Sequence, residues 1–199
     1  MLFPLFSKPI YIESLEINTE KICNILQNEK FENTNNSNCK KSNNQYILDR
    51  DDMKFLKEKI LKSFLNYINK NLKYEHKKFK ITTSWITKTI GLGSSELHRH
   101  RNSMFSGCLY LKTEPKKALI NFVNFDNNSF QLNVEENNIY NSQEFSFKMR
   151  EKIIIFFPSE LHHEIIASNQ SMERISLAFN LIPIGLVGNE LSDSHCKIA

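Results

Sequence analysis

The sequence contains little glycine, proline or tryptophan, and it has no long apolar run. Glycine and proline number five each in 199 residues, and there is a single tryptophan. This scarcity excludes collagen-like chains and low-complexity chains rich in proline and glycine. No apolar stretch reaches the ~18 residues of a membrane-spanning helix, so we expect no membrane partner. Residues 1–10 are apolar but lack a basic region and a small-residue cleavage site, which argues against a signal peptide.

The cysteines are widely spaced, and their spacing carries no metal or redox motif. No C-x-x-C pair occurs among the four cysteines, which are Cys23, Cys39, Cys108 and Cys196. Such spacing favours free thiols in a reducing compartment over disulfides or a zinc site. We therefore expect a cytoplasmic protein.

Charge is nearly balanced, which limits the classes of partner. The chain has 26 Lys and Arg against 22 Asp and Glu, giving a net charge of +4 and a pI near 8.8. A nucleic-acid-binding domain usually has a pI above about 9 and a clustered basic patch. The basic cluster between Lys73 and Lys80 fits a solvated connection better. A nucleic-acid partner is therefore not expected.

The apolar residues that are present suffice for one domain with an N-terminal support. Fifteen Phe and six Tyr supply large buried areas, and 199 residues is the length of one domain. Residues 1–80 predict a supporting region ahead of the core. Its expected elements are a strand at 2–12, a helix at 15–26, an exposed Asn-rich loop at 28–44 that could cover a site, and an amphipathic helix at 53–68.

Residues 81–185 are expected to form the core, followed by a tail at 186–199. Short aromatic and β-branched runs separated by polar turns predict a mainly β, antiparallel sandwich or barrel. These runs are 81–90, 106–112, 118–125, 129–134, 144–149, 152–157 and 174–181.

Three histidines fall beside predicted strands of this core. His98 and His100 are two positions apart, so in an extended chain their side chains point to the same side. His163 follows the apolar strand at 152–157. Neutral imidazoles from two strands can hold Fe, Zn, Cu or Ni in a site open on one side. An H-x-H pair alone is a weak signal, because single histidines are more often structural.

Arg174 begins the predicted strand 174–181. Its planar guanidinium could project into the barrel and bind a carboxylate through two parallel hydrogen bonds. Ser176, two positions on, would face the same side and could donate one more hydrogen bond. The alternative is a guanidinium at the rim, paired with Glu173 or with an acidic residue of a loop.

Five motifs in order resemble a known family. They are T-T-S-W at 82–85, L-H-R-H-R-N-S at 97–103, F-S-G-C-L-Y-L at 105–111, F-P-S-E-L-H-H-E-I at 157–165 and R-I-S-L-A-F-N at 174–180. Together with L-F-S-K-P-I-Y at 5–11, they resemble the 2-oxoglutarate/Fe(II)-dependent oxygenases of bacterial and phage genomes, relatives of prolyl hydroxylases. Each motif is weak by itself, whereas five in this order with fitting gaps form a specific signal.

The resemblance implies a double-stranded β-helix, or jelly roll, that uses Fe(II), 2-oxoglutarate and O2. It implies iron ligands at His98 and His163, with His162 outside the ligand set. His100 stands where the superfamily usually has a carboxylate. Glu96 is an alternative oxygen ligand two positions before His98.

The resemblance also assigns residues to the 2-oxoglutarate pocket. These are Arg174, which would hold the distal carboxylate, its helper Ser176, and the pocket residues Tyr110 and Asn102.

The expected activity is hydroxylation of a substrate coupled to decarboxylation of 2-oxoglutarate to succinate. The sequence leaves the substrate open, either a small molecule or a protein side chain, and it leaves the oligomeric state open. Two other functions fit parts of the pattern: a cupin-like metalloprotein that does not use 2-oxoglutarate, and a non-enzymatic binding module. A phage-encoded protein of this family would act in the host cytoplasm.

Overall fold

The computed structural model describes residues 2–3, 6–35, 38–114, 117–125, 132–167, 170–189, 191 and 193–199. Strands make up 43% of the described residues and helices 17%, so the predicted mainly β class is confirmed. Part of the strand expected at 129–134 lies outside the described residues, and residues 132–134 are not in a strand. Among the described residues, no helix is both long and apolar enough to cross a membrane.

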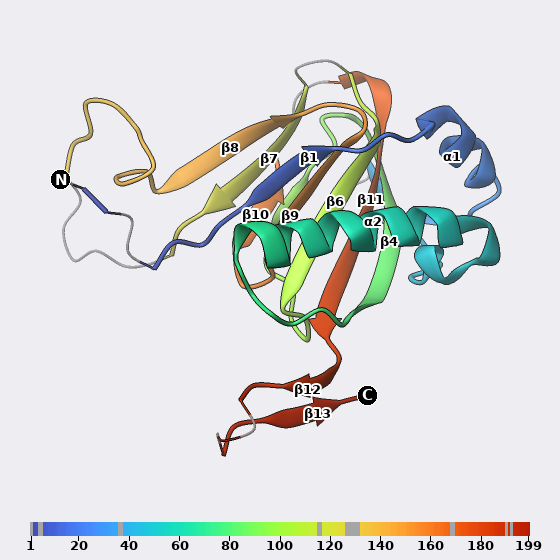
Figure 1. Ribbon diagram of the computed structural model, residues 1–199. Helices are drawn as coiled ribbons and strands as arrows, with labels where there is room; N and C mark the ends of the chain where they lie inside the picture. Colours follow the sequence, from blue (N-terminus) through green and yellow to red (C-terminus); the bar gives the residue numbers. More distant parts are fainter. Residues whose placement is uncertain are drawn as a thin grey trace.

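Two antiparallel sheets form the body of the molecule (Figure 1). The seven strands of the large sheet are, in spatial order, β1 (Tyr11–Ser14), β9 (Ile153–Pro158), β6 (Phe105–Lys112), β11 (Gln170–Pro183), β4 (Phe79–Gly91), β3 (Cys39–Ser42) and β2 (Phe31–Asn33). The four strands of the small sheet are β5 (Ser95–His98), β10 (His162–Ile165), β7 (Ala118–Val123) and β8 (Glu144–Met149). Neighbouring strands are mostly distant in sequence, as expected of a jelly roll.

Helices cover the outer face of the large sheet. α2 (Lys54–Leu65) crosses in front of this sheet in Figure 1 and continues into the π-helical segment η3 (Asn66–Asn71). The shorter α1 (Thr19–Ile25) lies at one edge, and the 3-10 turns η1 (Ile47–Asp49) and η2 (Asp51–Met53) lead into α2. The helical support expected from residues 15–68 is therefore present.

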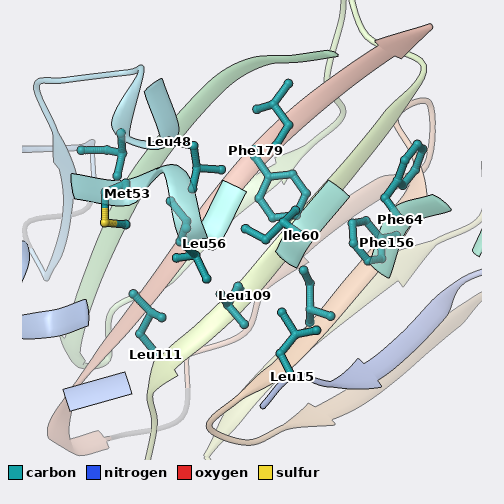
Figure 2. Close-up of a cluster of buried hydrophobic side chains, with 14 of the residues drawn as sticks. Leu15, Leu48, Met53, Leu56, Ile60, Phe64, Leu109, Leu111, Phe156 and Phe179 are labelled. Atoms are coloured by element: carbon teal, nitrogen blue, oxygen red, sulfur yellow. The ribbon is translucent and has the colours of Figure 1, made fainter. Parts of the chain in front are cut away.

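The core has two layers, one on each face of the large sheet. The first layer lies between the helices and the sheet and includes Ile60, Phe64, Leu109 and Phe179 (Figure 2). The second lies between the two sheets and includes Cys108, Tyr110, Ile120, Phe122 and Phe157. The space between the sheets is therefore only partly filled with apolar side chains.

Alternation along β11 divides its residues between these two layers. Ile175, Leu177, Phe179 and Leu181 face the helices. The intervening residues point the opposite way, because successive side chains of a strand alternate between faces. These are Arg174, Ser176, Ala178 and Asn180, and all four line a cavity between the sheets. The strand thus supplies core on one face and polar groups on the other.

The segment 28–44 is not the exposed loop that we expected. It contains the β2–β3 hairpin, which extends the large sheet by pairing β3 with β4. Cys39 and Ser42 are buried, and the Ser42 hydroxyl accepts a hydrogen bond from the backbone N–H of Ile86 at 3.0 Å. Backbone pairing at a sheet edge and one buried hydroxyl stabilise strands whose composition shows no apolar alternation.

The segment 186–199 is more ordered than the tail that we expected. It takes part in a two-stranded hairpin of β12 (Gly185–Val187) and β13 (Cys196–Ile198). The hairpin extends away from the two main sheets in Figure 1. The expected division of the chain after residues 80 and 185 stays a prediction.

Candidate functional site

A cavity of about 560 Å³ opens between the two sheets. Its walls come from the inner faces of β4, β6 and β11, from the β3 edge, and from β5 and β10 of the small sheet. All three predicted histidine ligands line it, as do Arg174 and Ser176. Residues from distant parts of the sequence therefore meet in one hollow of a size typical of small-molecule sites.

Strand pairing brings the three histidines together. His98 is the last residue of β5 and is paired directly with His163 of β10. His100 lies two residues beyond β5, where its backbone N–H donates to the Ser159 carbonyl at 3.0 Å. One ring nitrogen from each histidine lies within 4.8 Å of the others. The set can therefore hold one metal ion.

Backbone carbonyls fix the tautomers of two of these rings. The Nδ1 of His98 lies 2.7 Å from the Glu96 carbonyl, and the Nδ1 of His163 lies 3.0 Å from the Leu161 carbonyl. Because a carbonyl only accepts, each Nδ1 donates, which leaves the lone pair of the neutral ring on Nε2. The Nε2 atoms of His100 and His163 are 3.3 Å apart. The Nε2 lone pair of His163 therefore lies next to a ring nitrogen of His100.

Burial keeps two of the rings neutral. It lowers the pKa of His100 to about 3, with smaller contributions from His163 and His98. It also lowers the pKa of His163 to about 4, against the raising effect of the hydrogen bond to the Leu161 carbonyl. A histidine must be neutral to bind a metal. Both rings meet this condition at neutral pH.

The other candidate ligands lie outside the histidine cluster. Glu96 lines the cavity, but within the described parts of the chain no carboxylate belongs to the group of nearby ligand atoms. The His162 ring packs against Phe125, with centroids 4.5 Å apart. Adjacent strand residues point to opposite faces, which explains why His162 and His163 are separated.

Arg174 is a buried cation without a counter-ion. Its side chain is 1% exposed, and its Nη1 atom has no hydrogen-bond partner. Burial lowers its pKa. Where the structure describes the chain, no ion pair involves Arg174, and Glu173 is instead 3.9 Å from Lys88. The rim position that we considered as an alternative is therefore wrong.

Two further unpartnered groups lie near this guanidinium. Thr89 of β4 is directly opposite Arg174, and Tyr110 of β6 is directly opposite Ser176. The Thr89 Oγ1 and the Tyr110 hydroxyl are buried without hydrogen-bond partners. The pKa of Tyr110 is raised chiefly by burial, and the Arg174 charge opposes this rise. The expected pocket residue Tyr110 thus lies in the core layer between the sheets, near Arg174, and is not part of the cavity lining.

The structure places Asn102 outside the cavity, which differs from our expectation. Its side chain is exposed, and its φ of +58° lies in the left-handed region. Asparagine tolerates this conformation better than most residues. Its sequence position is therefore explained by the turn between His100 and β6 and not by the pocket.

A chain of hydroxyl and amide groups supports the loop that carries His100. Ser159 Oγ lies 2.8 Å from the hydroxyls of both Ser103 and Ser106. Ser106 Oγ donates to Asn180 Oδ1 at 2.8 Å, and Asn180 Nδ2 donates to Thr83 Oγ1 at 2.9 Å. All five residues belong to the motifs on which the family resemblance rests, but the sequence did not indicate that their side chains form one hydrogen-bonded chain.

Substituting Ser159→Ala should weaken this support. The change leaves the hydroxyls of Ser103 and Ser106 with one partner fewer, and unsatisfied buried groups cost about 1–3 kcal/mol of stability. Metal affinity should also fall, but by less than the about 10–100-fold of a direct outer-shell contact, because the Ser159 hydroxyl acts on His100 only through the loop. Denaturant unfolding and zinc titration measure the two effects. Ser171→Ala is the control, because it removes an exposed hydroxyl bonded to Glu114, and it should change neither the stability nor the zinc affinity. The same stability and zinc affinity in both variants would contradict the role of Ser159.

Comparisons with known proteins agree with this geometry. The family model described as "Putative 2OG-Fe(II) oxygenase" matches residues 83–180, a segment that includes the three histidines and Arg174. No curated protein matches the sequence.

Solved structures share the fold at low sequence identity. A prolyl-4-hydroxylase from Pseudomonas putida is 14% identical with a TM-score of 0.60, and the match covers 91% of this chain and 96% of that one. HygX from Streptomyces hygroscopicus, solved with nickel, 2-oxoglutarate and hygromycin B, is 9% identical with a TM-score of 0.64 and coverage of 88% and 83%. An oxidoreductase of the 2OG-Fe(II) oxygenase family from Burkholderia pseudomallei is 10% identical, with a TM-score of 0.60 and coverage of 82% and 76%. The predicted jelly-roll fold is confirmed.

Proposed function

From the premise that this chain belongs, through residues 83–180, to the 2-oxoglutarate/Fe(II)-dependent oxygenase family, we propose how its own residues perform that activity. The protein is a dioxygenase that uses Fe(II), 2-oxoglutarate and O2. His98, His100 and His163 hold the iron. Arg174 holds the co-substrate, with Ser176 on the same wall of the cavity.

The buried charge of Arg174 is the observation that carries this proposal. An uncompensated charge in the interior costs several kcal/mol. A fold retains such a charge where a ligand supplies the counter-charge. The distal carboxylate of 2-oxoglutarate matches the guanidinium in charge and in its planar, two-pronged geometry. The hydroxyls of Thr89 and Tyr110 are also buried without partners, and their residues are paired with Arg174 and Ser176 in the strand register, which supports a polar ligand in this region.

The histidine cluster fits iron in donor type and in number. Three neutral imidazoles leave other positions of a metal open, and imidazole suits iron. When bound, iron together with 2-oxoglutarate supplies the oxidation of a C–H bond by O2, with release of succinate and CO2. The protein orients the two ligands through the histidines and Arg174. It also limits the access of water, because His163 and Arg174 expose only 5% and 1% of their surface to solvent.

The location and the substrate belong to the same proposal. All four cysteines are free thiols, which supports a reducing compartment and hence the cytoplasm. The cavity volume of about 560 Å³ supports a small-molecule substrate over a large one.

Succinate formation from 2-oxoglutarate tests the proposed function. We expect succinate release that requires added Fe(II) and O2 and that stops when a chelator removes the metal. Only three side chains hold the ion, so a strong chelator can compete for it. Coupled detection of succinate measures the rate. Release that continues in the presence of the chelator would contradict a metal-dependent reaction.

A further inference from the structure

The cavity contains a second cation near the histidine cluster. Lys41 of β3 lies in register with Thr87 of β4, which is itself paired with Ser176. The Lys41 Nζ is 4.7 Å from the centroid of the Trp85 ring. Trp85 in turn lies 5.6 Å from the His100 ring, measured between centroids. Because Lys41, Trp85 and His100 all line the cavity, one aromatic ring separates this ammonium from a candidate metal ligand.

Lys41 has no acidic partner within reach. Among the described residues its Nζ takes part in no ion pair. Burial lowers the pKa of Lys41, and its exposed cross-strand neighbour Glu32 only partly opposes this shift, without an ion pair. An ammonium over an indole face is stabilised by about 0.5–2 kcal/mol, but its charge stays available to a ligand.

The charges of the site favour an anion. Three histidines in place of the usual two histidines and one carboxylate leave the ligand set one negative charge short. The charged residues that line the cavity are Lys41, Arg174 and the exposed Glu96. Under the proposed function, 2-oxoglutarate compensates Arg174. Glu96 is the one acidic residue of the cavity lining in the described chain, and it forms no ion pair with Lys41, so the ammonium keeps its charge for a ligand.

Resting on the proposed function, we infer that Lys41 and Trp85 bind the primary substrate, which is a small molecule carrying a carboxylate or phosphate group. The ammonium pairs with the anionic group, and the face of Trp85 holds Lys41 in place beside His100. The anion thereby fixes the substrate at one end, so that the rest of the molecule lies toward the histidine cluster. The cavity volume of about 560 Å³ is in the range of small-molecule sites.

The fluorescence of Trp85 provides a direct test, because it is the only tryptophan in the chain. Zinc-loaded protein saturated with 2-oxoglutarate is titrated with benzoate and phenyl phosphate, and with their neutral counterparts benzamide and phenol. We expect each anion to bind about 10- to 100-fold more tightly than its counterpart, the strength of a charge-assisted hydrogen bond. Equal affinities for the anionic and neutral compounds would overturn the inference.

Two lysine variants separate recognition by Lys41 from a general charge effect. Lys41→Met keeps the length of the side chain and should remove the preference for anions without changing the affinity for zinc or 2-oxoglutarate. Lys88→Met is the matched control: Lys88 also lies over an aromatic ring, with its Nζ 4.3 Å from the Phe31 centroid, but it does not line the cavity. We expect this variant to keep the preference.

Other results would assign Lys41 to a different ligand. Weaker 2-oxoglutarate binding in Lys41→Met, with an unchanged anion preference, would make Lys41 part of the co-substrate site and contradict the inference. Binding of a single-stranded oligonucleotide in place of both small anions would contradict a small-molecule substrate. If 2-oxoglutarate fails to bind the wild type, the proposed function fails, and the anion preference is then measured in the zinc-loaded protein without it.

Discussion

Replacing Arg174 with methionine is expected to weaken 2-oxoglutarate binding strongly and, at the same time, to stabilise the ligand-free fold. The guanidinium is 1% exposed and lacks a counter-ion among the described residues. Truncating one partner of a buried, hydrogen-bonded charge pair costs about 2–5 kcal/mol of binding, so the dissociation constant should rise at least about 30-fold. Removing a buried charge in favour of an apolar side chain of similar length should stabilise the empty protein by about 1–3 kcal/mol.

Thermal unfolding with and without 2-oxoglutarate measures both effects. Saturating co-substrate should raise the unfolding temperature of the metal-loaded wild type, since a ligand at 100 times its dissociation constant adds about 2.7 kcal/mol. The Arg174→Met variant should unfold at a higher temperature without ligand and should respond much less to the same 2-oxoglutarate concentration, with a gain of about 0.9 kcal/mol or less. Arg50→Met is the control, because Arg50 is paired with Glu29 and Asp52; it should leave the response to 2-oxoglutarate intact. A destabilised Arg174→Met that still binds the co-substrate would show that the guanidinium has a structural role instead.

Replacing His163 with alanine should remove metal binding, whereas the same change at His162 should not. His163 lies opposite His98 in the strand register, and its Nε2 lone pair faces His100. Loss of this ligand should lower metal affinity by more than the 10–100-fold that an outer-shell contact is worth. The neighbouring His162 packs on Phe125, away from the cluster.

Zinc titration by calorimetry compares the two histidine variants directly. Each removes one imidazole from the same strand, so a general loss of β10 would affect both. We expect His162→Ala to bind zinc within about threefold of the wild type, a difference of less than 1 kcal/mol. If the two variants lost affinity equally, the assignment of His163 as the ligand would be wrong.

Local patterns predicted much of this site from the sequence. The two-residue period of β11 indicated that Arg174 and Ser176 share a face, and the structure places both on the cavity wall. The H-x-H spacing indicated that His98 and His100 lie together, and their rings are 5.2 Å apart between centroids. Strand alternation does not explain this proximity fully, because β5 ends at His98. A hydrogen bond from the backbone N–H of His100 to the Ser159 carbonyl holds His100 in place.

Long-range pairing accounts for what the sequence did not reveal. The polar composition of segment 28–44 predicted a loop, although the segment contains the β2–β3 hairpin. The pairing of β3 with β4 brings Lys41 to the cavity. The burial of Arg174 depends on β4 and β6 on either side of β11. Such pairings join residues far apart in the chain, and no local period encodes them.

Anaerobic titration of Fe(II) into the protein with 2-oxoglutarate tests the central assignment most directly. We expect a visible charge-transfer band of the iron–2-oxoglutarate chelate that saturates at one iron per chain. The band should form in the wild type and in His162→Ala, and it should be absent from His163→Ala and Arg174→Met. Absence of the band from the intact wild-type protein, or its persistence in His163→Ala, would contradict the assignment of the cavity as an iron and 2-oxoglutarate site.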